Sequence, residues 1–188
     1  SSICMALYAA AESSQVPTQA HLELRGSYTK ICGTCVFRDK NVRADTTAKI
    51  GVQLYGDYLP FGWETGFGTL RVGPYGSVSA IGEVQKIAGG LAVVLRPKNA
   101  SWEVFTQTGA RYTTDEMRYQ FQGQAASQGQ AAFNLALGAR FDLGNQWYLS
   151  LVGEHDSNGR KIGITIFPYN GGFNPGVDSL MIGFGKSF

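Results

Sequence analysis

Three side chains near the C-terminus have the types and the order needed for nucleophilic ester chemistry. His155 and Ser157 are two residues apart in the run Glu154-His155-Asp156-Ser157-Asn158, and Asp178 lies further along the chain. An imidazole within reach of a serine hydroxyl can take its proton, provided that a carboxylate orients the ring and stabilises the imidazolium. These residues are therefore candidates for general base, nucleophile and orienting acid.

Their side chains meet only if two neighbouring strands present them on one face. His155 and Ser157 share the parity of the apolar residues Trp147, Leu149 and Leu151, and Asp178 shares that of Leu180, Ile182, Phe184 and Phe188. Side chains of equal parity lie on one face of a strand. In a barrel with a polar lumen this face is the lipid-facing one, where polar groups are costly and indicate a function. Glu154 and Asp156 have the opposite parity and are expected in the lumen.

Composition narrows the class of protein that carries these residues. Of 188 residues, 44% are hydrophobic, 25 are glycine and only 16% are charged, against about 25% charged in an average soluble domain. No apolar run approaches the roughly 20 residues of a spanning helix, which excludes a helical membrane protein. A net charge of +2 gives no sign of a polyanion-binding tail, and no nucleic-acid partner is expected.

Alternation of apolar and polar residues at period two predicts an all-β chain. Polar inner faces beside apolar outer faces are typical of a transmembrane barrel, whose closure satisfies every backbone group. We therefore expect an eight-stranded antiparallel transmembrane β-barrel of the outer-membrane type over residues 20–188. Residues 1–19 are expected to be a signal-peptide remnant or a disordered segment. The expected strands are His21–Tyr28, Thr46–Tyr58, Gly62–Val72, Val78–Leu95, Trp102–Thr113, Gln130–Asp142, Gln146–Ser157 and Val177–Phe188.

Connection lengths and aromatic residues give two further expectations. Short and long connections alternate, as periplasmic turns and extracellular loops do; the connection near Gly73 to Val84 is not placed. The expected short turns are Leu59–Phe61, Arg96–Ser101 and Leu143–Asn145, and the long loops are Ile31–Asp45, Thr114–Gly129 and Asn158–Gly176. Aromatic residues near strand ends are expected at the membrane interfaces, namely Tyr28, Tyr58, Trp63, Trp102, Tyr112, Trp147 and Tyr148.

The cysteines show no metal-binding pattern. Cys32 and Cys35 form a single C-x-x-C with neither a second pair nor nearby histidines, so a zinc site is not expected. We expect a short local disulfide or free thiols in a loop, without a catalytic role.

The C-terminal motifs resemble the lipid A 3-O-deacylase family, the PagL-like acyl hydrolases of the outer membrane. The likeness rests on His155-Asp156-Ser157-Asn158, on Asn174-Pro175-Gly176-Val177-Asp178 and on the final Phe188. It implies Ser157 as nucleophile, His155 as general base and Asp178 as orienting acid. Asn158 and Asn174 become candidates for oxyanion stabilisation or loop organisation. This sequence has Asp where the best-known member has Glu, and its 159–173 loop is longer than in compact members.

The resemblance implies a carboxylic ester hydrolase that releases the 3-O-linked acyl chain of lipid A, without a cofactor or metal. The expected partner is lipopolysaccharide in the bacterial outer membrane, with the active site towards the outer leaflet and a homodimer as a further option. One alternative is a non-enzymatic eight-stranded barrel with a structural or adhesion role. Another is a soluble barrel that binds a lipophilic ligand, which would need apolar residues facing inward.

Overall fold

A computed structural model describes residues 16–32, 48–82, 84–114, 117–121, 124–128, 131–156 and 176–188. The strands are β1 (Gln19–Cys32), β2 (Ala48–Leu59), β3 (Phe61–Glu64), β4 (Gly68–Ile81), β5 (Val84–Pro97), β6 (Trp102–Thr113), β7 (Met117–Phe121), β8 (Gln124–Gln128), β9 (Ala131–Gly144), β10 (Trp147–Asp156) and β11 (Gly176–Ser187). Within these ranges no helix is long and apolar enough to cross a membrane.

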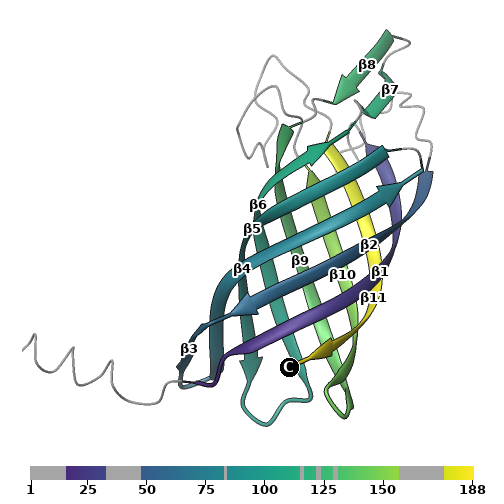
Figure 1. The fold of residues 1–188 in the computed structure, drawn as a ribbon. Helices are drawn as coiled ribbons and strands as arrows, with labels where there is room; N and C mark the ends of the chain where they lie inside the picture. The colour runs from purple at the N-terminus through teal and green to yellow at the C-terminus, as the bar shows by residue number, and fades with distance from the viewer. Residues whose placement is uncertain are drawn as a thin grey trace, which may run out of the picture.

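The strands close into an antiparallel barrel (Figure 1). Neighbours follow the order β2-β1-β11-β10-β9-β6-β5-β4-β3, and pairing of β2 with β4 closes the ring. Because β3 continues β2 along β4, the wall has eight strands, as the sequence predicts. β7 and β8 form a separate hairpin.

Alternation along each strand places polar residues in the lumen and apolar residues on the outer wall, which confirms the prediction of polar inner faces and apolar outer faces. In β1, His21, Glu23 and Arg25 are buried, whereas Leu22 and Leu24 are exposed. The other strands of the ring repeat this arrangement: the exposed outer wall is apolar, and most ionic residues lie inside together with a smaller apolar cluster that includes Phe105, Val152 and Met181. A soluble barrel with an apolar interior is therefore wrong for this chain.

Ion pairs and stacked rings fill the lumen near the end with the short turns. Arg140 donates to Asp57 Oδ2 at 2.8 Å and to Glu103 Oε1 at 2.9 Å. Arg25 lies 3.8 Å from the centre of the Tyr55 ring. An eight-stranded barrel is just wide enough for its own side chains, and here they pack as ion pairs beside a smaller buried apolar cluster.

The region from residue 59 to 73 corrects two predictions. Leu59–Phe61 is not a turn: three residues (58–60) face two of β4 (73–74), which makes a bulge at Pro60, and the chain continues into β3. Gly73 is required there, since a Cβ would collide with the Tyr58 carbonyl and the Pro60 ring. The true turn is 65–67, inside the expected Gly62–Val72 strand.

The expected strand Val78–Leu95 also contains a turn. β4 runs to Ile81 and only residues 82 and 83 separate it from β5, with Gly82 at φ 60°. This short connection lies at the barrel end that carries the long loops. The predicted strict alternation of short and long connections is therefore wrong here. The unplaced segment near Gly73 is therefore mostly strand.

Two of the three expected long loops and most of the N-terminal segment fall outside the described residues, whereas the third loop, Thr114–Gly129, contains the hairpin of β7 and β8. The longest segments outside the description are 1–15 with Cys4, 33–47 with Cys35, and 157–175. Cys32, predicted to lie in a loop, is instead the last residue of β1. Six of the seven aromatic residues expected at the interfaces are exposed on the outer wall. Tyr148 is the exception, because its side chain is 2% exposed and donates to Glu23 Oε2 in the lumen.

Candidate active site

The candidate site lies where β10 and β11 end at the long-loop end of the barrel. In the antiparallel register His155 lies directly opposite Asp178. The next pair, Asp156 and Val177, is the last one between the two strands. Residues directly opposite one another in such a pair have Cβ atoms about 4.5–5.5 Å apart. The backbone therefore brings these two positions together.

The two faces of β10 are sharply different at this end. His155, Gly153 and Leu151 are exposed on the outer wall, and Glu154, Asp156 and Val152 are buried in the lumen. On β11, Leu180 and Ile182 are exposed, whereas Val177 and Ser179 are buried. Asp178 occupies a register position of the same parity as Leu180; its side chain lies outside the described part of the structure.

Three predicted site residues fall outside the described ranges. Ser157 follows the last described residue of β10, and Asn158 and Asn174 belong to the 157–175 segment. The structure thus brings His155 and the backbone of Asp178 together, while Ser157, Asn158 and Asn174 keep their status as predictions.

Below His155, the outer wall has a gap in its side-chain cover. Gly153 stands between Leu137 of β9 and Leu180 of β11 in the register, and both leucines are exposed. A Cβ built on Gly153 meets no atom closer than the Leu137 carbonyl oxygen, at 3.9 Å. The strands on either side of β10 lie about 9–10 Å apart, so Gly153 leaves a position without a side chain between the two leucines.

On the lumen side, a buried lysine forms ion pairs with the two residues that flank His155. Lys86 of β5 donates to Glu154 and, at 2.9 Å, to Asp156 Oδ2. Asn134 Nδ2 donates to Asp156 Oδ1 at 2.7 Å, and the Arg111 guanidinium lies 3.6 Å from Asp156 Oδ2. All of these side chains are buried, so the end of β10 is held across the lumen as well as by its neighbours.

The sequence reasoning missed this cluster. Lys86 lies just after a turn that the alternation did not reveal, inside a segment treated as one strand. Gly82 between two alternating runs was the signal that could have located the turn. Among the described side chains, no three His, Cys, Asp or Glu residues gather as a metal site.

We expect replacement of Lys86 with methionine to weaken the barrel and to disturb the end of β10. Glu154 loses the ammonium group of Lys86, and Asp156 keeps the more distant Arg111 guanidinium as a cationic partner. Breaking a buried ion pair from one side costs about 3–5 kcal/mol. Urea unfolding of the refolded protein in detergent measures the change. Adding Glu154→Gln to Lys86→Met removes one unpaired carboxylate and should recover part of the lost stability. An unchanged urea midpoint in the Lys86→Met variant would contradict a stabilising role of the Lys86 ion pairs.

Comparisons with known proteins establish the type of fold, and the similar proteins differ in function. No family model and no curated protein matches the sequence. The outer-membrane enzyme PagL is similar in structure, with a TM-score of 0.59 and 13% identity over 88% of this chain and 98% of PagL. Ail, the attachment invasion locus protein of Yersinia pestis, has a TM-score of 0.53 and 13% identity over 92% of this chain and 100% of Ail.

Neisserial surface protein A is a third similar structure, with a TM-score of 0.50 and 8% identity over 90% of this chain and 97% of its own. At these identities the likeness establishes the eight-stranded fold of outer-membrane barrels. One neighbour is described as an enzyme and another as an attachment and invasion protein, so function must be argued from the site.

Proposed function

We propose that this protein spans the bacterial outer membrane and hydrolyses the 3-O-linked acyl ester of lipid A on its lipid-facing wall. The observation that carries the proposal is the register of His155 against Asp178, on an apolar wall and at the long-loop end. An imidazole on such a wall is costly, and an opposite carboxylate gives it the partner that general-base catalysis uses. The long loops are expected on the extracellular side, where the outer leaflet carries lipopolysaccharide.

In the proposed reaction, His155 removes the proton of the Ser157 hydroxyl as its oxygen attacks the ester carbonyl carbon. The tetrahedral intermediate collapses, the bond to the sugar oxygen breaks, and the imidazolium returns the proton to that oxygen. Water, deprotonated by the same imidazole, then attacks the acyl-enzyme; the bond to the Ser157 oxygen breaks, the imidazolium returns the proton to that oxygen, and the fatty acid is released. Asp178 orients the imidazole. Asn158 and Asn174 are candidates to donate hydrogen bonds to the oxyanion.

Mass spectrometry of lipid A tests the activity. Incubating the refolded protein with lipopolysaccharide that carries a 3-O-linked acyl chain should remove the mass of one 3-hydroxyacyl group and release the matching free acid. Lipid A that lacks an acyl group at this position serves as the matched control and should stay unchanged. Unchanged lipid A in both samples, with folded protein, would leave the non-enzymatic barrel as the better account.

In this proposal the acyl chain lies over Gly153, between Leu137 and Leu180, beside the scissile ester. We expect Gly153→Leu to lower kcat/KM by about 10-fold or more, since filling a hydrophobic subsite costs about 1–3 kcal/mol. Gly153→Ala is the control, because its added Cβ makes only an ordinary contact. Equal kcat/KM for wild type and Gly153→Leu would show that the chain lies elsewhere.

A further inference from the structure

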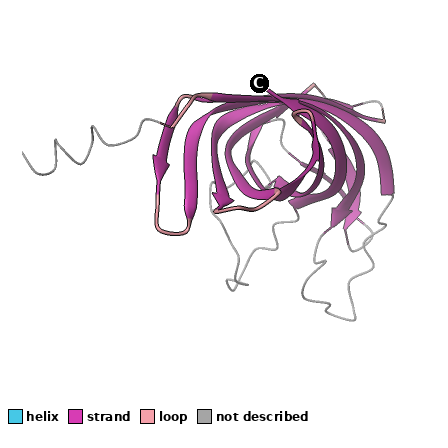
Figure 2. Ribbon diagram, turned by 90° about the horizontal axis from the view of Figure 1, so that it is seen from below, coloured by secondary structure: helices cyan, strands magenta, loops and turns pink. Residues whose placement is uncertain are grey.

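We infer that the β3–β4 hairpin is a lipid-interface anchor, which holds the barrel in the phospholipid leaflet opposite the candidate active site. The hairpin consists of β3, the 65–67 turn and the first residues of β4, up to Val72. Viewed along the barrel from the short-turn end, it lies to the side of the ring formed by the other strands (Figure 2). The inference does not depend on the proposed hydrolysis.

The hairpin extends past the closed part of the wall. Pairing of β1 with β2 begins at Gln19 and Leu59, so β3 lies beyond the start of β1. Among the described strands, β3 pairs with β4 alone and forms the end of the sheet order. The large apolar side chains of Phe61 and Trp63 are exposed beside this open edge, and such an apolar patch favours an environment that covers it.

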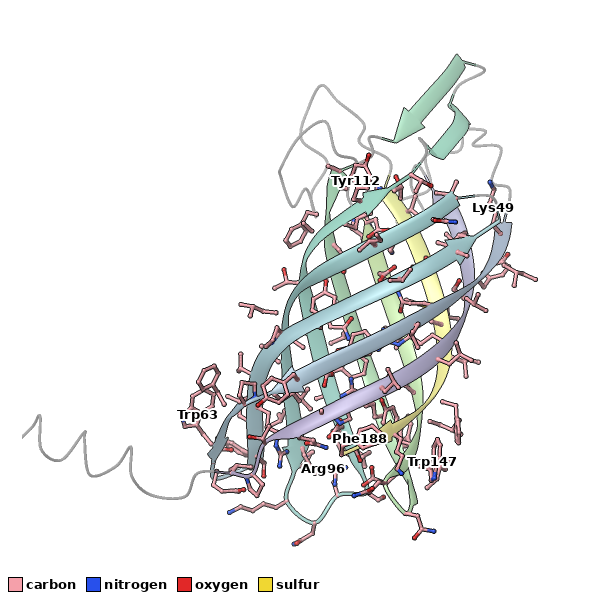
Figure 3. All side chains as sticks on the ribbon, in the orientation of Figure 1. Lys49, Trp63, Arg96, Tyr112, Trp147 and Phe188 are labelled. Atoms are coloured by element: carbon pink, nitrogen blue, oxygen red, sulfur yellow. The ribbon has the colours of Figure 1, made fainter. Side chains whose placement is uncertain are left out.

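The outer face of the hairpin is apolar, whereas the other face carries both polar and apolar contacts. The bulge at Pro60 changes the outward parity, so Phe61 and Trp63 face outward, opposite Val72 and Leu70. β5 continues this apolar face, because Leu95 stands opposite Leu70. On the other face, Thr69 Oγ1 donates to Glu64 Oε1 at 2.8 Å, and Val16 packs against Gly62. Trp63 projects away from the barrel in Figure 3.

The turn presents a third aromatic ring on a fixed backbone. Thr65 N donates to the Gly68 carbonyl at 2.7 Å, and the Phe67 carbonyl accepts from Lys98 N at 3.0 Å. The Phe67 side chain is nevertheless 85% exposed. Lys98, on the neighbouring turn, is also exposed. Aromatic rings at the boundary between lipid acyl chains and head groups, next to lysines whose ammonium groups reach the lipid phosphates, are typical of proteins at a phospholipid interface.

A second group at the same end of the barrel has the same composition. The Lys186 ammonium lies 5.7 Å from the centre of the Trp147 ring and 5.4 Å from that of Phe188. Trp147 and Phe188 lie near the end of the wall that carries Trp63 (Figure 3). The outer face of the hairpin is thus continuous with the apolar wall, and aromatic rings and a lysine lie at its border. This composition fits a phospholipid surface as the partner of the hairpin.

Depth-dependent fluorescence quenching tests the anchor. The chain has three tryptophans, so W102F/W147F leaves Trp63 alone, and W63F/W102F leaves Trp147 as the matched reference on the wall. Both variants are reconstituted into phosphatidylglycerol–phosphatidylethanolamine vesicles whose acyl chains carry bromine at shallow or deep positions. We expect Trp63 to be quenched several-fold more by shallow bromines than by aqueous acrylamide, with a depth close to that of Trp147.

Two results would overturn the inference. Strong acrylamide quenching without bromine quenching would place the hairpin in water, and protection from both quenchers would mean that protein, such as a second copy of the chain, covers it. If a double variant does not insert, subtracting the W63F signal from that of wild type gives the Trp63 contribution. Phe67→Asp combined with Lys98→Gln should raise the acrylamide sensitivity of Trp63 several-fold; an unchanged sensitivity would equally contradict the anchor.

Discussion

Alanine in place of His155 or Ser157 is expected to remove ester hydrolysis while the barrel still inserts. The imidazole and the hydroxyl act as one unit in nucleophilic catalysis, so losing either should lower kcat by about 10⁴-fold or more, and the double variant should be no worse than the single ones. Release of free 3-hydroxy fatty acid from lipopolysaccharide measures the rate. Folding is verified by the shift in gel mobility on heating.

A matched control uses the second histidine of the chain. His21 is buried in the lumen, with its Nδ1 2.7 Å from Asp57 Oδ1, at the far end of the barrel from His155. A His21→Gln variant that folds should retain near-normal kcat. Full activity in His155→Ala, or loss of activity in His21→Gln equal to that in His155→Ala, would contradict the proposed role of His155.

Asp178→Asn is expected to lower kcat by about 10⁴-fold, with a small effect on KM. The amide has almost the shape of the carboxylate, but it neither holds the required tautomer of the imidazole nor stabilises the imidazolium. Asp178→Glu places the same group on a longer side chain and should retain more activity than Asn. The measurement is a comparison of kcat and KM for the three proteins under one detergent condition.

The buried carboxylates of β10 provide the control for this variant. Glu154→Gln also removes one negative charge close to His155, but on the lumen side of the strand. Its kcat should fall far less than that of Asp178→Asn. Equal losses in both variants would mean that the overall charge near His155 matters and that Asp178 has no specific orienting role.

The sequence predicts the fold well because a barrel wall imposes period two on every strand. His21 to Tyr28 already separates buried polar residues from exposed apolar ones, and the structure follows that division. The errors arise where alternation carries no information about turns. Pro60 lies in a bulge that changes parity without reversing the chain, and the tight connection at Gly82 hides between two alternating runs.

The candidate site is predictable only as far as a single strand determines it. Parity places His155 outside and Glu154 inside, and both expectations agree with their burial. The register of His155 against Asp178 depends on how two strands align, which the spacing of residues suggests but does not determine. The contacts of Lys86 with Glu154 and Asp156 could not be predicted, even with the turn at Gly82 located, since they cross the lumen between strands far apart in the chain.

Covalent labelling with a fluorophosphonate lipid ester tests the central claim most directly, because it reports the nucleophile itself. Peptide mass spectrometry of the labelled wild-type protein should find the adduct on Ser157 and on no other serine. The His155→Ala variant, folded in the same detergent, should remain unlabelled. An adduct on a different residue, or a folded wild-type protein that gains none, would contradict a catalytic group on the outer wall of this barrel.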